Sequence, residues 1–170
     1  MLDRQFKVEK PNQVWVADIT YVSTKEGWLY VASLRDLYSR KIVGWHADRT
    51  MTKELVLKAL QQAYFHQKPE GSVLHHSDRG SQYASNDYQK QLQQYGMKCS
   101  MSRKGNCYDN ACIESFHGVL KKSSFISNNT KHVLKHSKIF GNTLKFFIIV
   151  KEFIQRIVIY RRQKKNVRTN

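Results

Sequence analysis

The stretch VWVADITYV, residues 14–22, decides the fold, because its composition is that of a buried strand. β-Branched and aromatic residues dominate it, in a nearly alternating pattern over a length that strands commonly have. One carboxylate, Asp18, interrupts the apolar run. An ionised side chain that is buried without a partner costs several kcal/mol. We therefore expect a compensating partner for Asp18, and a metal ion is an efficient one.

The segments that follow predict an α/β fold. Residues 28–39 and 41–49 have the composition of two more strands, and three strands so close in sequence imply an antiparallel meander. Helices and strands then alternate: a helix from Thr52, a strand over 72–78, a helix capped by Asn86, a strand over 97–102, and a helix capped by Asp109 or Asn110. This order predicts a mixed five-stranded sheet with helices on both faces, which is the architecture of a ribonuclease-H-like core.

Length and composition favour one globular domain. A chain of 170 residues that is 41% apolar can build a single core. The N-terminal residues lack the apolar centre of a secretory signal, and the longest apolar run, residues 146–150, is far short of the ~20 residues that span a bilayer. We therefore expect a cytoplasmic protein with no membrane partner. The cysteines, Cys99, Cys107 and Cys112, form no metal-ligand pattern and are expected to be free thiols.

The net charge of +16 suggests a polyanionic partner such as nucleic acid. The charge is unevenly distributed, however. Residues 1–120 hold 16 basic and 12 acidic residues, whereas residues 121–170 hold 13 basic residues and one acid. Because most of the excess lies in the tail, DNA binding by the rest of the chain does not follow from charge alone.

Three acidic residues form a candidate metal site. Asp18 lies within a strand, Asp78 ends a strand, and Glu114 lies in the first turns of a helix. Ligand sites in open α/β sheets form at strand ends. Carboxylates are also the ligands that Mg²⁺ or Mn²⁺ prefers, and two such ions can hold the attacking and leaving oxygens of a phosphoryl displacement. Taken singly, each acid has a simpler explanation: a salt-bridge partner for Asp18, a turn residue for Asp78, a helix-start acid for Glu114.

The sequence around these acids resembles a known family. Asp78 and Glu114 are separated by 35 residues, the interval of the D,D(35)E signature. The three acids lie in the strings PNQVWVADITYV, LHHSDRGSQYAS and MSRKGNCYDNACIESFHGVLKK. Over about residues 10–122 the chain is similar to the catalytic core of IS-three-type insertion-sequence transposases, which are related to retroviral integrases. The resemblance implies DNA strand cleavage and strand transfer, with Asp18, Asp78 and Glu114 as catalytic ligands of two Mg²⁺ or Mn²⁺ ions.

The resemblance also implies supporting residues. His76 matches a family position beside the site, although packing or a hydrogen bond at the strand end explains it equally well. Asn110 precedes Glu114 and can also simply cap its helix. The candidates for contacts to DNA phosphates are Lys121, Arg103 and Lys104. Surface lysines are usually just solvated, so these residues have an ordinary explanation as well.

The last part of the chain departs from the family. Residues 123–170 contain no proline and one acid, whereas the family continues through YKTR and EYIEVFYNR. When the codons of residues 147–151 are regrouped from each third base, they permit Tyr, Asn, Arg and Lys in the family's order. We therefore expect a reading-frame shift near residues 122–124, which gives a linker remnant over 1–10, a catalytic core over 11–122 and an aberrant basic tail over 123–170. A divergent DNA-binding tail is the alternative.

The expected function is that of a DNA transposase catalytic core, in a chain that is itself an inactive remnant. The resemblance implies a helical DNA-binding region before the core, and only about ten residues precede it here. The expected partners are transposon-end and target DNA, and another copy of the chain or a full-length transposase. Two alternatives are a ribonuclease-H-like nuclease that only hydrolyses, which the 35-residue spacing disfavours, and a DNA-binding regulatory fragment without catalysis.

Overall fold

The computed structural model of the chain describes residues 8–24, 27–102 and 117–118. Five strands and three helices fall within these residues. In chain order they are β1 (Val14–Thr24), β2 (Gly27–Asp36), β3 (Ile42–Asp48), α1 (Lys53–Gln67), β4 (Leu74–Ser77), α2 (Ser81–Ala84), α3 (Asn86–Gln94) and β5 (Lys98–Met101).

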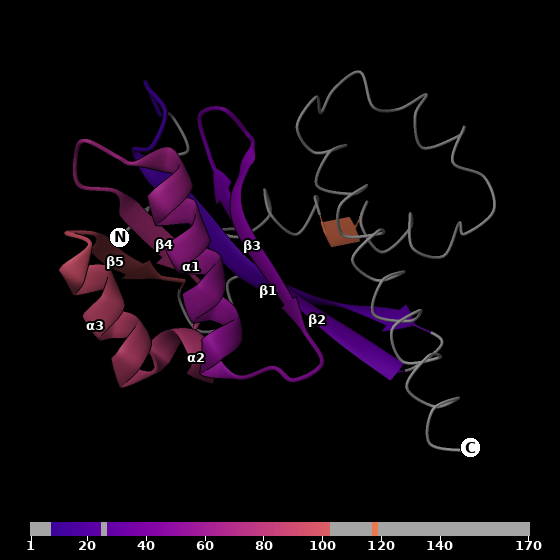
Figure 1. Cartoon of the computed structure of the whole chain (residues 1–170). Coiled ribbons are helices and arrows are strands. Elements are labelled where there is room, and N and C mark those ends of the chain that lie inside the picture. The colour runs from indigo at the N-terminus through magenta and orange to yellow at the C-terminus, as the bar shows by residue number, and fades with distance from the viewer. Residues whose placement is uncertain (1–7, 25–26, 103–116, 119–170) are drawn as a thin grey trace, which may run out of the picture.

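The strands form one mixed sheet in the order β3-β2-β1-β4-β5. The first three strands are antiparallel neighbours, whereas β4 runs parallel to both β1 and β5. The expected meander and the expected mixed five-stranded sheet are therefore confirmed. The stretch VWVADITYV makes up most of β1, the central strand, which joins the antiparallel half of this sheet to the parallel half (Figure 1).

One face of the sheet packs against the helices. Trp15 and Ala17 of β1 point to this face, together with Ala32 and Leu34 of β2. Figure 1 shows α1 lying across the sheet, with α2 and α3 beside it. The buried side chains of α1 recur at helical spacing, as the sequence predicts: Leu55, Val56, Ala59, Leu60 and Ala63.

Two local expectations need correction. Between the strand expected over 72–78 and the helix expected from Asn86, the structure has a short helix, α2, that the sequence pattern did not indicate. The N-cap of α3 is Ser85 rather than Asn86, since the Ser85 side chain accepts a hydrogen bond from the backbone N–H of Tyr88. Thr52 does precede α1 as its N-cap residue, but its side chain makes no capping hydrogen bond.

The opposite face of the sheet carries its own buried residues. Successive side chains of a strand alternate between faces, so Val16 and Asp18 point away from α1. Val16 of β1 and Val31 of β2 are fully buried and lie outside the core cluster that contains α1. Of the helix expected around Glu114, only residues 117–118 fall within the described part of the chain, where they are helical.

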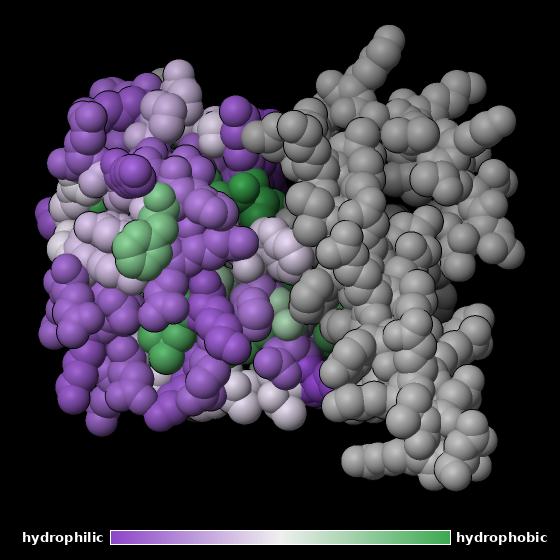
Figure 2. All heavy atoms as spheres, viewed as in Figure 1, coloured by the Kyte–Doolittle hydropathy of each residue, from purple (hydrophilic) through white to green (hydrophobic). Residues whose placement is uncertain are grey.

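The outer surface over the helices is mainly hydrophilic, with isolated hydrophobic residues (Figure 2). None of the described helices is long and apolar enough to cross a bilayer.

Candidate metal centre

The two expected aspartates meet at the centre of the sheet. β1 and β4 pair in parallel, and Ala17 lies opposite Ser77. Asp18 and Asp78 are the next residues of the two strands, so they occupy neighbouring positions. Asp18 follows Ala17, which points to the α1 face, so its carboxylate emerges on the opposite face. Asp78 directly follows β4 and lies near enough for the charge of Asp18 to raise its pKa. Residues far apart in the chain are thus brought together by the register of one strand pair.

Each carboxylate is held by a backbone donor. The N–H of Ile19 donates to Oδ1 of Asp18 at 2.8 Å, and the N–H of Gly80 donates to Oδ1 of Asp78 at 2.9 Å. Gly80 is also close to its acceptor: a Cβ placed there would lie 3.0 Å from the same oxygen of Asp78. The glycine therefore lets the backbone turn tightly around the Asp78 carboxylate at the end of β4.

The two aspartates bring two negative charges close together. Burial raises the pKa of Asp78, the hydrogen bond from Gly80 opposes that rise, and the negative charge of Asp18 adds to it. Within the described residues, neither aspartate forms an ion pair with a lysine or an arginine. Two adjacent carboxylates form a donor set that suits a hard divalent cation.

The third expected ligand, Glu114, lies outside the described residues. Among residues 8–24, 27–102 and 117–118, no group of three His, Cys, Asp or Glu side chains is placed to hold a metal ion. The described part of the chain thus supplies two of the three expected ligands.

His117 is a member of the site that the sequence pattern did not reveal. Its Nδ1 lies 3.1 Å from Oδ2 of Asp18, and its Nε2 lies 2.9 Å from Oγ of Ser33. The ring is 5% exposed, and Ser33 is fully buried on β2 directly opposite Asp18. One signal was available: His117 follows Glu114 by three residues, and residues three apart share a helix face.

His76 ties β4 to β5. Its Nδ1 lies 3.0 Å from Oγ of Ser100, which is its partner in the parallel register. His76 also points to the face of the aspartates, because it precedes Asp78 by two residues. The neighbouring His75 points to the other face, where its Nε2 lies 2.8 Å from the hydroxyl of Tyr88. Burial lowers the pKa of His75 to about 3, so this ring is neutral at pH 7.

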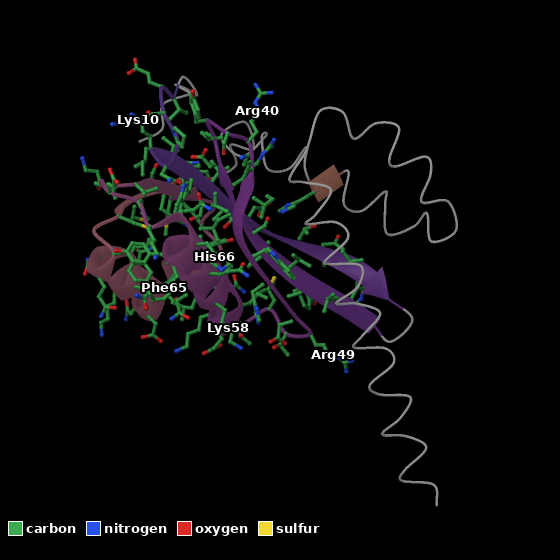
Figure 3. The ribbon with its side chains drawn as sticks, turned by 45° about the horizontal axis from the view of Figure 1, so that its top comes forward. Lys10, Arg40, Arg49, Lys58, Phe65 and His66 are labelled. Carbon is green, nitrogen blue, oxygen red and sulfur yellow. The ribbon has the colours of Figure 1, made fainter. Side chains whose placement is uncertain are left out.

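The remaining expected site residues lie outside the described part of the chain. They are Asn110, Arg103, Lys104 and Lys121. Figure 3 places Arg40 and Arg49 at opposite ends of the sheet and Lys58 on α1, so these three basic side chains do not share one surface. This scatter agrees with the view that charge alone does not identify a DNA surface on this part of the chain.

Known proteins are similar to this chain in sequence. The family model described as integrase core domain matches residues 8–107. An uncharacterized 31 kDa protein of insertion element IS600 from Shigella sonnei is 46% identical over 168 residues, which are 99% of this chain and 57% of that protein. The transposase InsF for insertion sequence IS3A from Escherichia coli (strain K12) is 50% identical over 121 residues, which are 71% of this chain and 42% of that protein. The chain thus spans about half the length of these curated relatives.

Solved structures show the same fold at low sequence identity. An integrase catalytic core domain from HTLV-2, solved in complex with magnesium in its dimeric form, gives a TM-score of 0.56 at 18% identity and covers 81% of this chain and 83% of that one. A chain from a simian T-cell lymphotropic virus intasome in complex with a PP2A regulatory subunit gives a TM-score of 0.64 at 20% identity, covering 81% of this chain and 47% of that one. The likeness shows that the fold is the ribonuclease-H-like fold of integrase catalytic cores.

Proposed function

Because the chain belongs to the integrase core domain family, we propose that Asp18, Asp78 and Glu114 together bind divalent cations for the cleavage and joining of DNA strands. The proposed substrates are the DNA ends of an insertion sequence and a target DNA. The proposed ions are two Mg²⁺ or Mn²⁺, since the donors are carboxylate oxygens. The residues of this centre have different roles, which follow from their positions in the fold.

The observation that carries the proposal is the pair of adjacent aspartates. Two like charges close together repel each other, and burial increases the cost of ionising Asp78. A protein retains such a pair at a cost in stability unless a cation offsets the repulsion. The similar HTLV-2 catalytic core was solved in complex with magnesium, which supports the choice of ion.

The protein's own part in the reaction is to fix the donors. The backbone donors at Ile19 and Gly80 each hold one oxygen of a carboxylate, so that the remaining lone pairs point in defined directions. The chemistry that a pair of ions supplies when bound is activation of water or of a DNA 3′-hydroxyl, together with stabilisation of the leaving 3′ oxygen. Asp18 and Asp78 sit on a rigid central strand pair, which keeps the donors in register during a displacement.

Binding of Mn²⁺ by the full chain tests this proposal. Free Mn²⁺ is measured by electron paramagnetic resonance while the chain is titrated, for the unaltered chain and for Asp78→Asn. We expect the unaltered chain to bind Mn²⁺ and the variant to lose most of that binding, because an amide cannot supply the negative charge. The matched control is Asp87→Asn, which removes an exposed carboxylate of α3 that pairs with Lys53 and should leave Mn²⁺ binding unchanged.

The same measurement separates the proposal from a purely DNA-binding role. A regulatory fragment without catalysis has no need of the ions, so the unaltered chain would bind DNA yet leave Mn²⁺ in solution. Equal Mn²⁺ binding by the unaltered chain and by Asp78→Asn would also contradict the proposed ligand set.

A further inference from the structure

The imidazole of His117 joins the neighbouring strands β1 and β2 on the face that carries Asp18. It contacts Oδ2 of Asp18 on β1 through Nδ1 and Oγ of Ser33 on β2 through Nε2. Asp18 and Ser33 are direct partners in the antiparallel register. Because the ring and Ser33 are both buried, these two hydrogen bonds are protected from competition with water.

The chemistry of the partners fixes the roles of the two ring nitrogens. An ionised carboxylate only accepts hydrogen bonds, so Nδ1 must carry a proton and donate it to Asp18. In the neutral ring Nε2 then has no proton and accepts the hydroxyl proton of Ser33. The acceptor-only carboxylate of Asp18 thereby sets the tautomer, and the Ser33 hydroxyl, which can donate or accept, completes a hydrogen-bond array from Ser33 through His117 to Asp18.

This Ser–His–Asp order does not make a nucleophile of Ser33. Its side chain is fully buried in the middle of β2, so no substrate reaches its hydroxyl. The other end of this hydrogen-bond array is different, because the Asp18 side chain is 18% exposed. The accessible group at the end of the array is therefore the carboxylate, and the array acts on its orientation.

We propose that His117 is a positioning residue, which fixes the Asp18 carboxylate in the rotamer that receives a divalent cation. The inference rests on the proposed metal centre and adds the group that orients one of its ligands. Among the residues that the structure describes, each oxygen of Asp18 then has one donor, the N–H of Ile19 on Oδ1 and the His117 ring on Oδ2. Each oxygen also keeps lone-pair capacity for a cation.

Mn²⁺ affinity of full-length variants tests the inference, with electron paramagnetic resonance as the readout. His117→Phe keeps a ring but removes the donor, and we expect it to weaken Mn²⁺ binding by about 10–100-fold, the usual effect of losing a group that orients a metal ligand. His117→Asn places an amide nitrogen where Nδ1 lies and should restore most of the affinity. Ser33→Ala should give a smaller loss, because the ring and its donor to Asp18 remain and only the hydrogen bond that holds Nε2 is removed.

Tyr88→Phe is the matched control. It removes a buried hydrogen bond of similar length to a histidine, between Tyr88 and His75, on the other face of the sheet. Melting temperatures in EDTA show how far each variant is destabilised. A merely structural role for His117 would make the loss of affinity follow the loss of stability, and Tyr88→Phe would then weaken Mn²⁺ binding as well.

The outcomes distinguish the inference from the proposed function. If the unaltered chain binds no Mn²⁺, the proposed metal centre is wrong and His117 has no ligand to orient. If the unaltered chain binds Mn²⁺ and His117→Phe binds it equally well, the metal centre stands and the positioning role is overturned. A His117→Asn variant as weak as His117→Phe would also overturn it, since the donor at the δ position would then be irrelevant.

Discussion

Folding holds the Asp78 carboxylate where its ionised form is disfavoured. Its pKa is raised above the usual 3.8, by burial first and by the charge of Asp18 in addition. A raised pKa means that Asp78 favours the folded state below the unfolded pKa, and that this contribution is lost as pH rises through the folded pKa. Near pH 7 the metal-free chain therefore carries the cost of the charge. We predict that Asp78→Asn raises the free energy of unfolding, measured with urea in EDTA at pH 7, by no more than about 1 kcal/mol, because solvent screens the partly exposed group.

The pH dependence of this effect provides its check. The difference between Asp78→Asn and the unaltered chain should vanish below about pH 3.8, where the aspartate is protonated in both states. Asp87→Asn is the control of opposite sign: the hydrogen bond and charge of Lys53 lower the pKa of Asp87, so removal of its charge should not stabilise the chain at pH 7. A lower midpoint for Asp78→Asn at pH 7 would show that other interactions of this carboxylate outweigh the repulsion.

The aspartates could be predicted from the sequence, whereas their surroundings could not. Asp18 stands out as a charge within an apolar strand, and Asp78 as the end of the next parallel strand. Neither pattern shows that the two positions are adjacent, because adjacency depends on the pairing of Ala17 with Ser77. His117 is harder still, since its partner lies 99 residues away and its own local sequence offers only a helix-face argument.

The contact between β3 and α1 depends on one glycine. Gly44 faces α1, and a Cβ added there would lie 2.4 Å from the carbonyl oxygen of Ala59 and 2.6 Å from the Cβ of Ala63. Backbone atoms cannot move aside as a flexible side chain can, so α1 would have to shift away from the sheet. We predict that Gly44→Ala lowers the free energy of unfolding by at least the ~1–3 kcal/mol typical of overpacking. Urea unfolding of the full chain, followed by tryptophan fluorescence, measures the change.

Gly71→Ala is the matched control for this contact. No heavy atom lies within 4 Å of a Cβ at Gly71, so the same substitution should change stability by no more than about 0.5 kcal/mol. If both variants unfold at the same urea concentration, the close approach of α1 to β3 is not a constraint on the fold.

At the level of elements, type and order were easier to predict than boundaries. The strands and the two longer helices follow from apolar periodicity, because the sheet and its core repeat that periodicity in space. The short helix α2 escaped prediction, since four residues after Gly80 carry too little pattern to set them apart from a turn. The cap of α3 shifts by one residue because Ser85 and Asn86 are both good caps, and only the hydrogen bond to Tyr88 decides between them.

For the whole molecule, the described residues account for one covered face of the sheet. α1, α2 and α3 share a single core with the side chains that point to their side. The other face carries Asp18 and buried valines such as Val16 and Val31. The face that carries Asp18 is therefore the one that α1, α2 and α3 do not cover.

The coding DNA of residues 123–170 provides the last prediction, because we propose that this segment is translated out of frame. The match to InsF covers 71% of this chain, as an out-of-frame tail predicts, whereas the match to the IS600 protein covers 99% of it, as an in-frame tail predicts. The coding DNA discriminates between these two explanations of the tail. We expect a single-base insertion or deletion near codon 123 whose reversal restores a tail that reads YKTR and then EYIEVFYNRKRIHSANSYLSP. The chain as it stands should not cleave DNA of its own insertion-sequence ends in Mg²⁺, and the frame-restored chain should. A coding sequence in which no such change restores that tail, or cleavage by the unaltered chain, would contradict the proposal.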